Sequence, residues 1–130
     1  MKNVKKVIGL SLAVLMILGS ATAAYASARY VCIREFLFSG SVTSTSVVGE
    51  ANVGLSGAYD SETVITLERS SGGEFQDYLI LTKKSSTRSS YTASASKSGL
   101  SSAYDYRLRA ELFVYDDNGN QIDYDCSYID

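Results

Sequence analysis

The chain has 130 residues and a formal net charge of −2, and it contains no histidine, proline or tryptophan. This length allows one domain of ordinary size. The absence of histidine excludes imidazole bases, histidine-activated nucleophiles and histidine metal ligands. The charge balance gives no electrostatic support for a nucleic-acid partner, and two cysteines are too few for a four-thiolate zinc site.

Residues 1–26 have the pattern of a secretory signal peptide. Three lysines lie in the first six residues, an apolar run covers residues 7–18, and Ala24 and Ala26 fit the small-residue rule for cleavage. We expect cleavage after Ala26, with Ala23 as second choice, because the apolar run is shorter than the about 20 residues of a membrane span. The predicted protein is secreted, has no membrane partner after cleavage, and is extracellular or associated with the cell surface.

The predicted organisation is a signal peptide followed by one domain over residues 27–130, with a net charge of −5. Cys32 and Cys126 are the only thiols of this domain. Export puts them in an oxidising setting, where an even pair indicates a disulfide. Such a bridge closes most of the chain and would stabilise the fold by about 4–5 kcal/mol in the chain-entropy treatment. The alternative is two free, buried thiols.

After the signal peptide, apolar and polar residues alternate with the period of two that indicates β-strands. Glycine, serine and asparagine clusters separate the alternating runs. Seven strands are predicted, over residues 30–38, 47–55, 63–69, 74–83, 91–96, 104–115 and 122–129. Short, turn-separated strands of this number predict an all-β, antiparallel two-sheet sandwich, with a small closed barrel as the alternative.

Tyr106 lies near the start of the longest predicted strand, six residues after Leu100. This spacing indicates a tyrosine corner, in which a tyrosine hydroxyl bonds backwards across a turn between sheets. The strand pattern and this corner resemble immunoglobulin-like and fibronectin type III-like domains over residues 29–130, without the tryptophan and central cysteine pair of antibody domains. In such sandwiches the first and last strands are commonly neighbours, which is consistent with a bridge between them.

The overall layout also resembles small, uncharacterised, secreted β-sandwich proteins of Gram-positive bacteria. The shared features are the signal peptide, Arg29 and Tyr30 near the mature start, and strands rich in serine and threonine. This resemblance implies a location outside the cell and carries no activity with it.

Residues 116–120 predict a hairpin turn, because Asn118–Gly119 tolerates the positive φ values of a two-residue type I′ turn. Asp116, Asn118 and Asn120 also offer oxygen ligands of the kind that Ca²⁺ prefers. The segment departs from the calcium-loop pattern, because Gly119 stands at position four instead of six and no glutamate closes the loop. We therefore expect a structural turn and no metal or other cofactor, with these three residues as the candidate ligands of a calcium ion.

Tyrosine is the enriched aromatic residue, and its rigid, amphipathic ring suits contacts with proteins and sugars. Tyr59 lies in a predicted turn, and Lys83, Lys84 and Arg88 form a local basic patch. These four residues are the candidate binding surface. Its possible partners are a cell-wall polymer, a glycan or a protein.

We expect no catalysis. Without histidine, acid–base chemistry near neutral pH requires a carboxylate or lysine shifted by burial, and a sandwich of this size offers little interior for a cleft. Asp123 and Asp125 are predicted on the outward face of the last strand, as solvated charge that discourages edge-to-edge aggregation. The predicted function is a secreted, non-catalytic binding or structural module, with a small bacteriocin-like toxin as the alternative.

Overall fold

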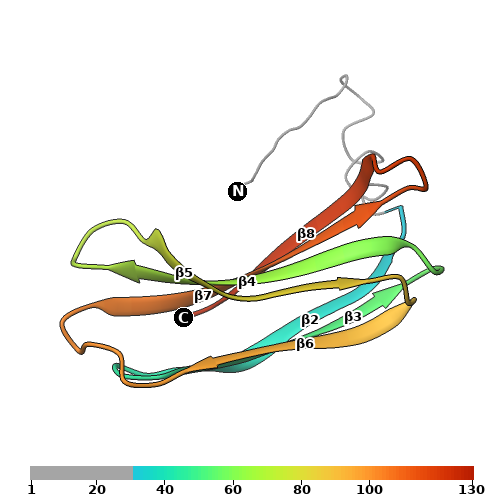
Figure 1. Ribbon diagram of the computed structural model, residues 1–130. Helices are drawn as coiled ribbons and strands as arrows, with labels where there is room; N and C mark the ends of the chain where they lie inside the picture. The colour runs from blue at the N-terminus through green and yellow to red at the C-terminus, as the bar shows by residue number, and fades with distance from the viewer. Residues whose placement is uncertain (1–30) are drawn as a thin grey trace, which may run out of the picture. The chain divides into compact units, whose positions relative to one another are not determined.

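Figure 1 shows the computed structural model, which describes residues 31–130. The predicted signal peptide and its cleavage site lie outside the described residues. Between residues 31 and 130 no helix is long and apolar enough to cross a membrane. The described part contains seven strands: β2 (Ile33–Val42), β3 (Val47–Leu55), β4 (Asp60–Ser70), β5 (Gln76–Ser86), β6 (Ser90–Lys97), β7 (Asp105–Tyr115) and β8 (Gln121–Ile129).

The strands form two antiparallel sheets that lie one over the other (Figure 1). One sheet has the order β2-β3-β6 and the other the order β5-β4-β7-β8. The β3–β6 and β4–β7 pairs join strands that are not consecutive, so the chain crosses between the sheets three times. The predicted all-β, two-sheet sandwich is confirmed, and its seven strands are consistent with an immunoglobulin-like architecture.

Each predicted strand corresponds to an observed one, and the ends differ by a few residues. β4 begins at Asp60, three residues before the predicted start, because Asp60 pairs with Tyr115 and Ser61 with Val114 of β7. The polar sequence at this end does not alternate clearly. The length of β4 is therefore set by its long neighbour, which provides backbone partners along the whole strand.

The core lies between the sheets, and large side chains on one sheet face small ones on the other. The fully buried large residues of the four-stranded sheet are Ile65, Leu67, Leu108, Leu112 and Val114. On the three-stranded sheet, Ala51 and Ala93 are fully buried, and Gly49 lies beneath the Phe38 ring. A Cβ at Gly49 would stand 2.9 Å from that ring, so glycine provides the space that the core requires.

The central strand β4 is also buried on the outer face of its sheet. There the Glu68 side chain, 4% exposed, accepts hydrogen bonds from Arg107 Nε at 2.9 Å and from Arg109 Nη1. Arg109 also donates to Asp77 at 2.8 Å. Burial by itself would lower the pKa of Arg109, but the hydrogen bond to Asp77 and the nearby negative charges raise it overall. A buried carboxylate requires such partners, so this cluster ties β5, β4 and β7 together.

Where β5 meets the edge of β6, side chains join the two sheets. Thr82 Oγ1 donates to the Ser94 carbonyl at 2.6 Å, and Lys84 Nζ donates to the Thr92 carbonyl at 2.8 Å. These two donors on β5 occupy carbonyl groups on the outer edge of β6. The contacts cover an edge that would otherwise be open to pairing with another chain.

At the opposite corner, where β2 meets β8, a buried carboxylate joins the sheets. Asp123 Oδ2 accepts the backbone N–H groups of Cys32 at 2.9 Å and Ile33 at 3.2 Å. Asp123 is 6% exposed, so its prediction as solvated, outward-facing charge is wrong. The reason is its register with β7, since Asp123 pairs with Val114, a residue that faces the core.

Cys32 and Cys126 are not bonded, so the predicted disulfide between them is also wrong. β2 and β8 do meet, but the two cysteines occupy opposite faces of the four-stranded sheet. Cys32 is buried on the inside with its sulfur 3.6 Å from Asp123, whereas Cys126 pairs with Glu111 on the outside. Asp123 and Cys126 are three positions apart, and an odd separation along a strand points two side chains in opposite directions.

The predicted tyrosine corner is confirmed. The Tyr106 hydroxyl donates to the Ser101 carbonyl at 2.7 Å, and the residue is 6% exposed. Leu100 is buried in the same apolar cluster. The hydrogen bond fixes the segment that carries the chain from β6 in one sheet to β7 in the other.

Replacing Tyr106 by phenylalanine tests this corner. Tyr106→Phe should lower the free energy of unfolding by about 1 kcal/mol or more, because the hydrogen bond from the buried Tyr106 to the Ser101 carbonyl is lost. The matched control is Tyr104→Phe, since the described contacts of Tyr104 are made by its ring. Urea unfolding gives both values, and equal stability of the two variants would contradict a corner hydrogen bond.

Thiol labelling tests the separation of the cysteines. Under denaturing conditions and without reductant, both cysteines should take up an alkylating label. In the folded protein Cys32 should resist the label, because it is 1% exposed, while Cys126 should react first. Mass spectrometry of peptides measures both results, and a chain that takes up no label before reduction would contradict the free thiols.

Candidate binding groove

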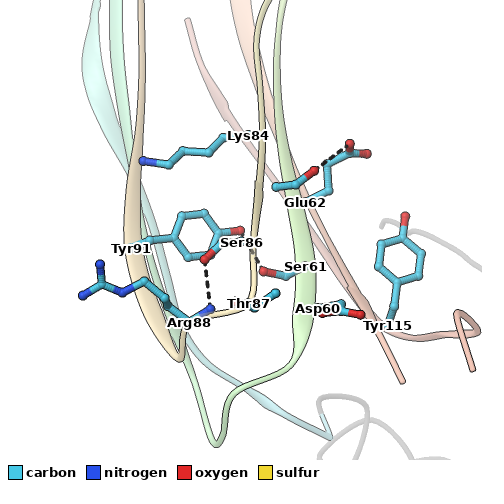
Figure 2. A pocket seen from close by; sticks show the side chains of 10 residues that line it. Asp60, Ser61, Glu62, Lys84, Ser86, Thr87, Arg88, Tyr91 and Tyr115 are labelled. Atoms are coloured by element: carbon cyan, nitrogen blue, oxygen red, sulfur yellow. Dashed lines mark hydrogen bonds between the residues drawn. The ribbon is translucent and has the colours of Figure 1, made fainter. Parts of the chain in front are cut away.

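An open groove of about 630 Å³ lies at one end of the sandwich (Figure 2). It is built from the start of β4, the end of β5, the β5–β6 turn, the start of β6 and the end of β7. Its lining residues are Asp60, Ser61, Glu62, Lys84, Ser85, Ser86, Thr87, Arg88, Tyr91 and Tyr115. The lining therefore combines aromatic rings with hydroxyl groups and charges of both signs.

Tyr91 lines this groove, and hydrogen bonds to β4 hold its side chain in place. Its hydroxyl lies 2.8 Å from Thr63 Oγ1 and accepts a hydrogen bond from Ser61 Oγ at 3.0 Å. The ring packs against buried apolar residues of the core, and Lys84 Nζ lies 5.9 Å from its centroid. The hydrogen bonds from β4 hold the Tyr91 ring at the junction of the two sheets.

Charges of opposite sign stand on different sides of this tyrosine. Figure 2 shows Lys84 and Arg88 on one side of Tyr91, and Asp60 and Glu62 with Tyr115 on the other. Glu62 accepts a hydrogen bond from Ser85 Oγ at 3.5 Å. A ligand in the groove would therefore meet hydrogen-bond donors on one side and acceptors on the other.

Two of the four residues predicted to form a binding surface lie in the groove. Lys84 and Arg88 line the groove, whereas Lys83 and Tyr59 do not. Lys83 pairs with Val64 on β4, and alternation along β5 turns it away from its neighbour Lys84. Tyr59 was predicted to be free for contact, but it is half-buried and packs against apolar residues of the core.

Tyr91 and Tyr115 are groove residues that sequence reasoning did not single out. Both alternate normally in their strands, so nothing in the sequence distinguishes them from other half-buried tyrosines. The polar residues Ser61 and Thr63 at inward positions of β4 are the one signal, because buried hydroxyls require a partner.

The residues considered as ligands of a calcium ion lie in the β7–β8 hairpin turn. Asp116 Oδ1 accepts the backbone N–H groups of Asn118 and Asn120, each at 2.9 Å, and these bonds, that of Asn120 first, lower the Asp116 pKa. The hairpin is confirmed, but it is a three-residue loop with Gly119 at φ 82°, and the predicted two-residue turn is wrong. Between residues 31 and 130, no group of three or more acidic or thiol side chains is placed to hold a metal ion.

Cys32 and Asp123 form a second cluster of ionisable side chains, at the β2–β8 corner. Burial, the Asp123 charge and the hydrogen bond to Asp123 together raise the pKa of the Cys32 thiol to about 11. A thiol that stays protonated near neutral pH is a poor nucleophile. The Cys32 thiol therefore acts as a buried donor in the fold.

No protein-family model, curated protein or solved structure matches the chain. The chemistry of the groove is then the guide to function. Its lining brings aromatic rings, hydroxyl groups, hydrogen-bond donors and acceptors together in one groove, an arrangement suited to a ligand with many polar groups.

Stability at alkaline pH tests the environment of Cys32. The folded-state pKa of about 11 lies above the ordinary value of 9.0, so the stabilisation is complete below pH 9 and is lost as pH rises toward 11. Burial also raises the pKa of Cys126 and, to about 12, that of Tyr128, so both add to the loss. Urea unfolding between pH 8 and pH 10 should show a shallower decline for Cys32→Ser than for the wild type. Identical slopes would contradict this assignment.

Proposed function

We propose that the protein is a secreted, non-catalytic binding module that holds a glycan of the cell surface in this groove. The observation that carries the proposal is the placement of Tyr91 between cationic and anionic side chains in one open groove, with Tyr115 beside the anionic ones (Figure 2). The signal-peptide pattern supports a location outside the cell.

The lining suits sugar hydroxyl groups in three ways. Lys84 and Arg88 donate hydrogen bonds, Asp60 and Glu62 accept them, and a tyrosine ring offers an apolar face to a sugar ring. A polyanion such as nucleic acid fits less well, because carboxylates stand across the groove from the cations. A neutral or weakly charged glycan satisfies both sides.

The groove favours binding over hydrolysis. Glycoside hydrolysis requires two carboxyl groups that flank the scissile bond, usually in a site that closes around the sugar and excludes water. Asp60 and Glu62 are instead surrounded by serine, threonine and lysine side chains in an open groove. Hydrolysis of a glycan that disappears in Asp60→Asn would contradict a purely binding role.

Retention on isolated cell-wall glycan tests the proposal. Arg88→Ala should weaken retention about tenfold or more, because a charged donor in the groove is lost. Lys83→Ala is the matched control: it removes the same charge from a neighbouring position that does not line the groove, and its retention should equal that of the wild type. Equal losses in both variants would indicate attraction by net charge and would overturn the groove as the site.

A further inference from the structure

At the end of β4 farthest from the groove, Arg69 lies against two tyrosine rings. Its guanidinium carbon is 3.8 Å from the centroid of Tyr78, on β5, and 4.2 Å from the centroid of Tyr104, which precedes β7. Contact with aromatic faces restrains the plane of a guanidinium group. The head group of Arg69 is thus held by rings from two separate segments.

The N–H groups of Arg69 have no acceptor within residues 31–130, where no carboxylate or carbonyl is bonded to its guanidinium. The neighbouring arginines of the same sheet differ, because Arg107 and Arg109 both donate to Glu68. Aromatic faces attract the cation but leave its in-plane N–H donors available. The two rings therefore orient the Arg69 guanidinium, and no acidic side chain of residues 31–130 forms an ion pair with it.

A cavity of about 370 Å³ lies beside this arginine. It is lined by Arg69, the two rings and the β4–β5 turn, where Ser70 Oγ holds the turn by donating to the Gly73 carbonyl at 2.7 Å. Asp77 also lines it, but its carboxylate is occupied by Arg109 at 2.8 and 3.2 Å. Ser71 and Gln76 add polar side chains to the lining.

We propose that this cavity binds the carboxylate of a sugar acid, with Arg69 as the bidentate donor. A restrained, planar guanidinium matches the two oxygens of a carboxylate. The volume is near the lower limit of small-molecule pockets and suits a ligand of monosaccharide size. Glu74 on the lining disfavours a doubly charged phosphate, because it adds negative charge beside the same arginine.

The site is separate from the groove, so this inference does not depend on the proposed function. Titration of the ¹⁵N-labelled protein with glucuronate, at constant ionic strength, should shift the backbone amide signals of the β4–β5 turn and of Tyr78. Glucose and the methyl ester of glucuronate keep the ring and remove the charge, so neither should shift these signals. Equal shifts with all three sugars would overturn the proposal, and this comparison requires no variant.

Variants test the role of the guanidinium. Arg69→Lys keeps the charge but loses the planar pair of donors, so glucuronate binding should weaken about tenfold or more. Lys83→Ala is the matched control, because it removes a positive charge from the same sheet at a position that lines neither this cavity nor the groove. It should leave glucuronate binding unchanged. Unaltered binding in Arg69→Lys, or an equal loss in Lys83→Ala, would contradict a specific carboxylate site.

Discussion

The hydrogen bonds that join the two sheets at their corners are the constraint on which this sandwich depends. Asp123 accepts backbone N–H groups at the β2–β8 corner, and Thr82 and Lys84 donate to carbonyls at the β5–β6 corner. These contacts satisfy edge groups that no neighbouring strand pairs. They also position Lys84 for the groove, so one side chain serves both the fold and the candidate site.

Charged residues on the four-stranded sheet fall into two groups with different consequences. Glu68 is buried, and its arginine partners Arg107 and Arg109 make a closed cluster that stabilises the sheet. Arg69 belongs to the same sheet but is held by aromatic rings. Arg107 and Arg109 donate hydrogen bonds to a carboxylate within the protein. Arg69 is held only through the faces of aromatic rings, so its N–H groups can donate to a ligand.

The sequence by itself determined the strand class, the number of strands and two local structures. Alternation with period two predicts β3 with the observed bounds, because its inward residues are consistently apolar or small. Tyr106 and the 116–120 segment are local signals, since a corner bond and a turn each depend on residues close in sequence. Half of the predicted binding surface, Lys84 and Arg88, also lines the observed groove.

Only the tertiary structure decided which face of β8 is buried, and therefore that Asp123 lies inside the sandwich and Cys126 outside it. Tyr124 and Tyr128 lie on one face of this strand and suit a core, whereas Asp123 lies on the other face and suits a surface. The sequence alone therefore favours burial of the wrong face. Pairing with the inward residues of β7 directs Asp123 to the inside and Cys126 to the outside. Alternation separates two faces of a strand but does not say which one meets the core, since that depends on partners distant in sequence.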